Sequence, residues 1–243
     1  TPLFEQLELP NHSVSPAALA RSPFNRFHCG SATIHPYQTA PQLFETLTDI
    51  CRCSRQRQFT YADYPEIDFL SHKHGSMSAE VASDLKAPDH RFERFLEEIV
   101  GTDTTVLVTA DHGFVDPTPE QKIELADYPE IAQTLAKPLC GEPRVAYCYV
   151  KSGQEDKFET LVADQLGGKV RRFPSEQLVQ DEYFGLGEAH PRLNDRIGDF
   201  TLVMESEHML KDWLPGEKRF DFQGVHGGVN DTEMLVPSCI AEV

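Results

Sequence analysis

Basic residues are scarce in this sequence. Its 243 residues include 22 Lys and Arg against 39 Asp and Glu, which gives a formal net charge of −17 at pH 7. A general nucleic-acid binder needs a cationic face for the phosphate backbone, so we expect no binding of nucleic-acid duplexes. If the ligand of this protein is a phosphate, something other than surface lysines must attract it.

Long apolar runs, internal repeats and low-complexity tracts are also missing. The absence of an apolar run of about 20 residues excludes a membrane-spanning segment in this chain, and the composition excludes collagen. With 40% hydrophobic and 25% charged residues, the chain can bury a sizeable core and does not resemble a disordered segment. These absences leave the class of globular domains.

Cysteine is thinly spread along the chain. The six cysteines are Cys29, Cys51, Cys53, Cys140, Cys148 and Cys239. A chain of this length does not need disulfide bonds for stability, so we expect reduced, partly buried thiols. The C-x-C spacing of Cys51 and Cys53 is only a weak indication of a metal site, because no second Cys/His pair follows at zinc-finger spacing.

The start of the sequence lacks both an initiator methionine and the pattern of a signal peptide. We therefore expect that the chain does not begin where its gene begins. A signal peptide would lie upstream, so the compartment stays open, with the cytoplasm favoured.

Helical and strand patterns alternate along the first half of the chain. Apolar residues at helical spacing predict helices over 41–53 and 78–100, the second of them kinked or divided by Pro88. Residues 59–61 predict a short strand. The continuous β-branched run at 104–109 predicts a strand that is buried on both faces.

The second half of the chain continues this alternation after a proline-rich loop. Residues 116–143 predict a surface loop with one short helix over 131–135. Further segments predict strands at 145–150, 169–173 and 200–204 and a helix at 155–166. The alternation predicts an α/β fold with a largely parallel sheet, and residues 144–180 predict a small strand-helix-strand subdomain on it.

Polar residues follow the strand at 59–61, where ligands bind in open α/β sheets. Asp68 and His72 are four residues apart, so on one helical turn their side chains would converge on the same point. A carboxylate oxygen and an imidazole nitrogen on one face suit a metal ion. The alternative interpretation is the start of a surface helix, with Asp68 as its capping residue.

Two later segments carry the same chemistry. Asp111 and His112 follow the strand at 104–109, and Gly113 permits unusual backbone torsions there. His226 lies between glycines near the C-terminus. A helix N-cap for Asp111 and a turn role for His226 are the alternative interpretations.

The three segments together form a donor set without thiolates. Its members are Asp68, His72, Asp111, His112 and His226. Carboxylates and imidazoles without thiolates suit zinc in a catalytic site, with manganese or iron as alternatives.

The order of these motifs resembles the nucleotide pyrophosphatase/phosphodiesterase family, the type I phosphodiesterases of the alkaline phosphatase superfamily. The motifs are Y-x-x-x-P-E-x-D-x-x-x-H-x-x-G at 61–75, V-T-A-D-H-G at 108–113, H-G-G at 226–228 and E-M-L-V-P at 233–237. The resemblance implies an alkaline-phosphatase-like α/β/α sandwich with a mostly parallel sheet. Residues 1–243 would be the C-terminal two-thirds of one such catalytic domain, incomplete at the N-terminus, with 144–180 as an inserted subdomain.

The resemblance also implies hydrolysis of nucleotide pyrophosphate or phosphodiester bonds at two zinc ions. Asp68, His72 and His226 would hold one ion, and Asp111 and His112 would hold part of the other. The family's nucleophilic Thr or Ser and one further Asp ligand have no counterpart here. We expect both in a missing N-terminal segment, so the catalytic nucleophile is unknown and this chain alone should have little or no activity.

Other functions of the same superfamily stay open, namely a phosphomonoesterase, a sulfatase or a phosphomutase. A non-catalytic metal-binding domain is a further alternative. The expected partner is a nucleotide or another phosphoester of low molecular mass. Because an incomplete sheet leaves an apolar edge uncovered, self-association or an unseen partner segment is also expected.

Overall fold

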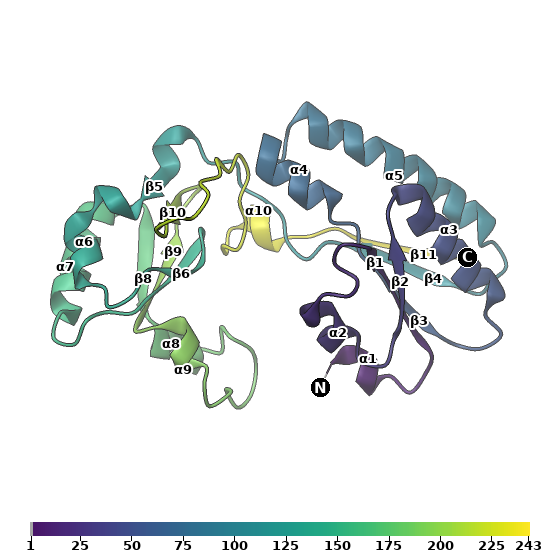
Figure 1. The fold of residues 1–243 in the computed structure, drawn as a ribbon, viewed down its shortest axis with the longest axis horizontal. Coiled ribbons are helices and arrows are strands. Elements are labelled where there is room, and N and C mark those ends of the chain that lie inside the picture. The colour runs from purple at the N-terminus through teal and green to yellow at the C-terminus, as the bar shows by residue number, and fades with distance from the viewer. Residues whose placement is uncertain (1) are drawn as a thin grey trace. The chain divides into compact units, whose positions relative to one another are not determined.

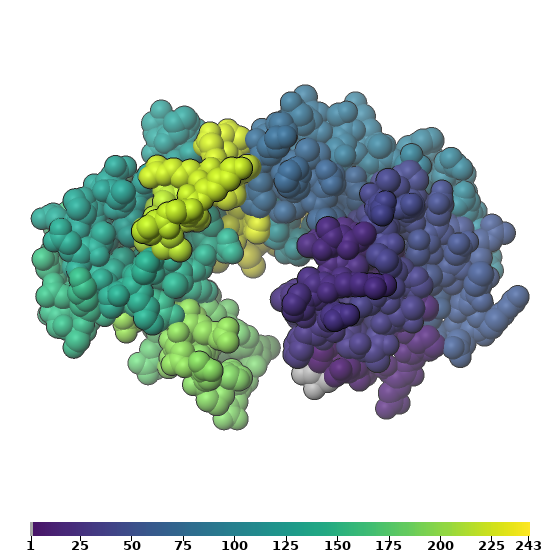
Figure 2. Space-filling model, in the orientation of Figure 1, coloured from purple at the N-terminus to yellow at the C-terminus, as the bar shows by residue number. Residues whose placement is uncertain are grey.

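A computed structural model describes residues 2–243 (Figure 1). The chain divides into two compact units, the first formed by residues up to 70, 77–109 and 238–243, the second by 71–76 and 110–237. Figure 2 shows one face of the molecule, with the purple-to-blue segments of the first unit and the teal-to-green segments of the second. Within residues 2–243, no helix has the length and apolar character needed to cross a bilayer.

A parallel sheet forms the centre of the first unit. Its strands are β1 (Asn11–Pro16), β2 (Thr33–Tyr37) and β3 (Phe59–Ala62), in the order β2-β1-β3. Helix α3 (Ala40–Cys53) packs on β1 and β2 and against α5 (Ala79–Glu98). The helix α3 and the strand β3 confirm the sequence prediction, whereas β1 and β2 were not predicted.

Helix α5 and the pair of strands that follows it correct two expectations. The helix is one continuous element that includes Pro88, so of the two predicted alternatives, a kink or a division, the division is excluded (Figure 1). Strand β4 (Thr105–Thr109) pairs antiparallel with β11 (Ser238–Glu242). The prediction that this strand is buried on both faces was wrong, because Leu107 is 59% exposed and, among residues 2–243, β11 is the only strand that pairs with β4. Its β-branched residues reflect strand propensity and not burial.

An antiparallel sheet forms the centre of the second unit. Its strands are β6 (Cys140–Glu142), β7 (Val145–Cys148), β9 (Phe200–Met204) and β8 (Val170–Pro174), in that order. The predicted strand-helix-strand elements are present as β7, α7 (Glu155–Leu166) and β8, but β9 lies between the two strands. The fold is therefore mixed α/β, as predicted, although the alternation of elements did not predict this antiparallel sheet.

The core of this second unit is apolar. Phe158 and Leu166 on α7 pack with Leu202 and Met204 on β9, and all four side chains are fully buried. Helix α6 (Pro129–Thr134) adds Ile131 to the same core. Burial of a side chain of this size contributes roughly 1.5–3 kcal/mol, so this core stabilises the unit.

The remaining elements are short. They are α1 (Leu3–Gln6), α2 (Pro23–Cys29), α4 (Glu66–His74), two 3-10 helices (Pro119–Gln121 and Leu125–Asp127), β5 (Lys122–Glu124), α8 (Ser175–Gln180), α9 (Asn194–Ile197), β10 (Met209–Lys211) and α10 (Asp231–Met234). Strands β5 and β10 form a parallel pair.

One ion pair lies fully buried in the second unit. Arg144, directly before β7, donates from Nε and from a terminal nitrogen to the two carboxylate oxygens of Glu233 on α10, at 3.0 and 2.7 Å. The guanidinium also donates to the backbone carbonyls of Ser206 and His208. Glu233 accepts a further hydrogen bond from the backbone nitrogen of Gly228 at 2.8 Å. The pair thus joins four backbone segments at one point.

We expect that removal of either partner strongly destabilises the second unit. Arg144→Met leaves a buried carboxylate, and Glu233→Gln leaves a buried guanidinium, without its counter-charge. Each change should lower the free energy of unfolding by about 3–5 kcal/mol, measured by urea denaturation.

The exposed ion pair Arg192–Asp195 supplies the matched control, because its side chains are 71% and 64% exposed. Arg192→Met should lower the free energy of unfolding by less than about 1 kcal/mol. Equal effects at the two ion pairs would contradict the structural role of Arg144.

Candidate metal centre

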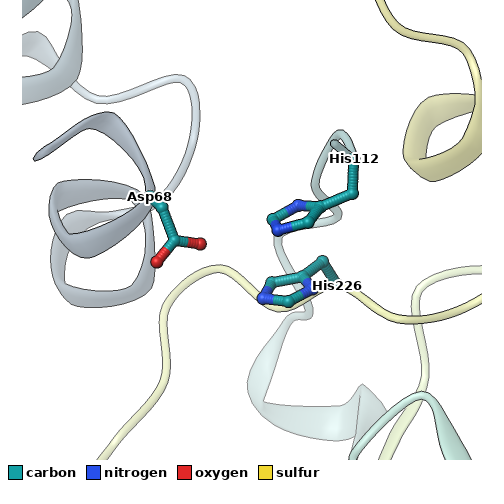
Figure 3. A group of neighbouring side chains, drawn as sticks. All are labelled: Asp68, His112 and His226. Carbon is teal, nitrogen blue, oxygen red and sulfur yellow. The ribbon is translucent and has the colours of Figure 1, made fainter. Parts of the chain in front are cut away.

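Three histidine rings lie together in the second unit. His72 belongs to α4, His112 follows β4 and His226 follows the segment that pairs with Val115. The rings of His112 and His226 are stacked, with centroids 3.5 Å apart and planes 9° from parallel (Figure 3). The His72 ring lies with its centroid 5.1 Å from that of His226. Segments far apart in the sequence therefore bring three imidazoles to one place.

Backbone hydrogen bonds hold the segment that carries His226. Val115 and Val225, both buried, exchange two backbone hydrogen bonds of 2.9 Å. The backbone nitrogen of Gln223 donates to the His72 carbonyl at 2.9 Å. Gln223 and Val225 are both fixed in this way, so the backbone that leads into His226 is held in place.

Two of the histidines have their ring orientation fixed by carbonyl groups. Nδ1 of His72 lies 2.9 Å from the Gly224 carbonyl oxygen, and Nδ1 of His112 lies 3.0 Å from the Gly113 carbonyl oxygen. A carbonyl oxygen only accepts, so each Nδ1 donates the hydrogen bond to it. A ring nitrogen held by a backbone carbonyl in this way is common in histidines that ligate a metal.

Phe114 packs against all three imidazoles. Its ring centroid lies 5.3 Å from those of His72 and His112 and 5.2 Å from that of His226, each at a steep interplanar angle. Such edge-to-face contacts restrict the rings and exclude water from one side of the group. The sequence analysis missed this role, because an aromatic residue after a D-H-G motif carries no signal of its own.

Two glycines are required here by the close approach of other atoms. A Cβ on Gly113 would lie 2.0 Å from the Thr232 carbonyl oxygen, and a Cβ on Gly228 would lie 2.5 Å from a carboxylate oxygen of Glu233. The expectation that Gly113 adopts an unusual torsion was wrong, since its φ is not positive. The glycine is needed because the chain at 232 passes against it.

The two aspartates that the sequence singled out lie in different surroundings. Asp68 belongs to α4, one turn before His72, and is the third residue of the helix, so it does not cap the helix (Figure 3). The Asp111 side chain is 89% exposed, and one of its oxygens lies 3.7 Å from Nε2 of His112. No helix among residues 2–243 begins at Asp111, which excludes the capping interpretation.

One further carboxylate was missed by the sequence analysis. Asp116 accepts from the backbone nitrogen of Ser76 at 2.8 Å and from the Ser76 hydroxyl at 3.1 Å. These bonds fix the chain directly after α4, the helix that carries His72. Nothing in the spacing of Asp116 distinguishes it from an ordinary loop residue.

Figure 3 draws three side chains that carry donor atoms of the kind that ligate a metal ion, namely Asp68 on α4 and His112 and His226 in the second unit. One carboxylate oxygen and two imidazole nitrogens form the donor set of several catalytic zinc sites.

Comparisons with solved structures find the same fold in proteins of low sequence identity. Murine ectonucleotide pyrophosphatase/phosphodiesterase 5, as an inactive variant in complex with AMP, is 18% identical with a TM-score of 0.67, over 99% of this chain and 63% of that one. Phosphonoacetate hydrolase from Sinorhizobium meliloti 1021, in complex with phosphonoacetate, is 17% identical with a TM-score of 0.66, over 98% and 66%. The chain thus spans less than two-thirds of these proteins.

A comparison with curated proteins gave no significant match. The family model of type I phosphodiesterase / nucleotide pyrophosphatase, in contrast, matches residues 14–228, which is most of the chain. The match includes both Asp-His motifs and the H-G-G motif that carries His226. The chain therefore belongs to the type I phosphodiesterase / nucleotide pyrophosphatase family and has an alkaline-phosphatase-like α/β fold.

Proposed function

We propose that this chain supplies the metal-binding part of a hydrolase for nucleotide pyrophosphate or phosphodiester bonds. The observation that carries the proposal is the group of three imidazoles, two of which have their orientation held by a hydrogen bond from Nδ1 to a backbone carbonyl. Membership of the phosphodiesterase family supports the reaction class.

The donors fit zinc, with manganese or iron as alternatives, because they are carboxylates and imidazoles without a thiolate. Following the family resemblance, we assign Asp68, His72 and His226 to one ion and Asp111 and His112 to part of the other. Phe114 and the carbonyls of Gly113 and Gly224 would orient the rings toward the ions.

Bound zinc ions supply the positive charge that lowers the pKa of an attacking hydroxyl and stabilises the phosphoryl oxygens. The chain's own residues hold and orient these ions, and its net charge of −17 offers no other general attraction for a phosphate. The proposed metal centre therefore answers the question that the acidic composition raised.

We propose that the nucleophilic hydroxyl and a further Asp ligand belong to a segment outside this chain. The span of 63% of the murine relative supports this, as does the absence of the family's Thr motif. Ser13 and Ser15 on β1 do not replace the nucleophile, because both are buried and their hydroxyls are hydrogen-bonded to each other at 3.2 Å.

Loss of one proposed ligand should weaken zinc binding. His226→Ala and Asp68→Asn should each raise the dissociation constant for Zn²⁺ at least about tenfold, because each removes a donor atom. Isothermal titration calorimetry with Zn²⁺ on the metal-free chain measures this.

His90→Ala is the control for this titration. His90 lies on α5, its side chain is 74% exposed, and it pairs with Glu93 at 3.4 Å. Its substitution should leave zinc affinity within about twofold of the parent chain, as is usual for surface changes. A parent chain that binds no zinc, or a His226→Ala variant that binds it equally well, would rule out the proposed centre.

The zinc-loaded chain should not hydrolyse a nucleotide ester. Because the proposed nucleophile lies outside the chain, hydrolysis of the nitrophenyl ester of thymidine monophosphate should be no faster than in buffer that contains zinc but no protein. A parallel assay with nitrophenyl phosphate tests the alternative that the protein is a phosphomonoesterase. Turnover of either ester by the purified chain that is lost in His226→Ala would overturn the proposal that the nucleophile lies elsewhere.

A further inference from the structure

Two histidines face each other on neighbouring strands of the first unit, apart from the centre described above. His12 is the second residue of β1 and His35 is the third residue of β2. In the parallel register Val14 lies opposite His35 and His12 opposite Thr33, so the two histidines are diagonal neighbours on one face of the sheet. Nδ1 of His12 lies 3.0 Å from Nε2 of His35.

This spacing of ring nitrogens is close to that of two ligands of one metal ion. At zinc–nitrogen distances of about 2.0–2.1 Å, two tetrahedral ligand atoms lie about 3.3 Å apart. The two nitrogens lie at hydrogen-bond distance, and a metal ion would take the place of that hydrogen bond after a shift of a few tenths of an ångström.

The histidines open into a pocket that contains two more donors. The pocket has a volume of about 510 Å³ and is lined by both rings and by one face of α3, with Thr46, Asp49, Ile50 and Cys53. Residues 46, 49, 50 and 53 recur at helical spacing, so they share that face. Cys53 is a free, exposed thiol at the end of the helix.

The pocket also decides between the two cysteines of the C-x-C motif. Cys51 does not line the pocket. Cys53 lines the pocket together with both histidines. The weak indication of a metal site in the C-x-C motif therefore concerns Cys53 alone. The other ligands of the ion would come from other segments, so the spacing within the motif could not predict them.

We propose that His12, His35 and Cys53 form a second site for a divalent transition-metal ion such as Zn²⁺, with Asp49 as a fourth ligand. The two imidazoles are already at ligand spacing, and the side chains of Cys53 and Asp49 turn toward them from α3 when the ion binds. Two nitrogens, one sulfur and one oxygen suit zinc or cobalt and do not suit magnesium or calcium. All four residues belong to the first unit, so the inference does not rest on the proposed function.

Cobalt titration tests the proposal, because Co²⁺ takes the place of Zn²⁺ and gives a near-ultraviolet absorption band when a thiolate binds it. The parent chain should show this band, and Cys53→Ser should lose it. Cys140→Ser is the matched control, since Cys140 is also free and exposed but lies in the second unit. A band that survives Cys53→Ser, or is absent from the parent chain, would overturn the assignment.

The histidines are tested by the number of cobalt ions bound, measured by equilibrium dialysis. His12→Ala and His35→Gln should each lose one equivalent, whereas His90→Ala should lose none. Circular dichroism identifies any variant that fails to fold, and Gln at 35 keeps much of the side-chain volume. The band should persist in His226→Ala, which removes only the other candidate centre. Unchanged stoichiometry in both folded histidine variants would refute the site.

Discussion

The buried ion pair between Arg144 and Glu233 is the interaction on which the candidate metal centre depends. Glu233 binds the backbone nitrogen of Gly228, two residues after His226, while its own carbonyl accepts from the backbone nitrogen of Gly113, next to His112. One residue therefore fixes the backbone beside both stacked rings. A charge placed in the protein interior is costly unless every oxygen and nitrogen is satisfied, and the four segments around this pair provide the partners.

The sequence predicted the local chemistry of the site but not the contacts that hold it. The Asp-His motifs follow strands and the H-G-G motif follows no regular element, and each was identified from residue type and position. Arg144 and Glu233 are 89 residues apart, and nothing in either segment signals the other. Gly113 was noticed for the wrong reason, because its requirement comes from the Thr232 carbonyl, a contact that only the fold creates.

The same distinction explains the outcome for the fold. Helices α3 and α7 and strand β9 have continuous patterns of apolar residues, so the sequence predicted them closely. Strand β1 was missed because its residues Asn11–Pro16 are mostly polar. Ser13 and Ser15 are nevertheless buried there, and their hydroxyls are hydrogen-bonded to each other. Strand β4 has the reverse property, an apolar sequence on an exposed element. Burial depends on what packs against a strand, which its own residues do not state.

The histidines at the two candidate sites differ in the hydrogen-bond partner of Nδ1, and this difference affects how each site would bind a metal. Nδ1 of His72 and of His112 donates to a backbone carbonyl, and this hydrogen bond holds the orientation of each ring. Between His12 and His35 the hydrogen bond joins the two potential ligand atoms themselves, so an ion must displace that hydrogen bond before it binds. A metal at this second site therefore competes with an existing interaction, and the thiolate of Cys53 is the donor that would offset its loss.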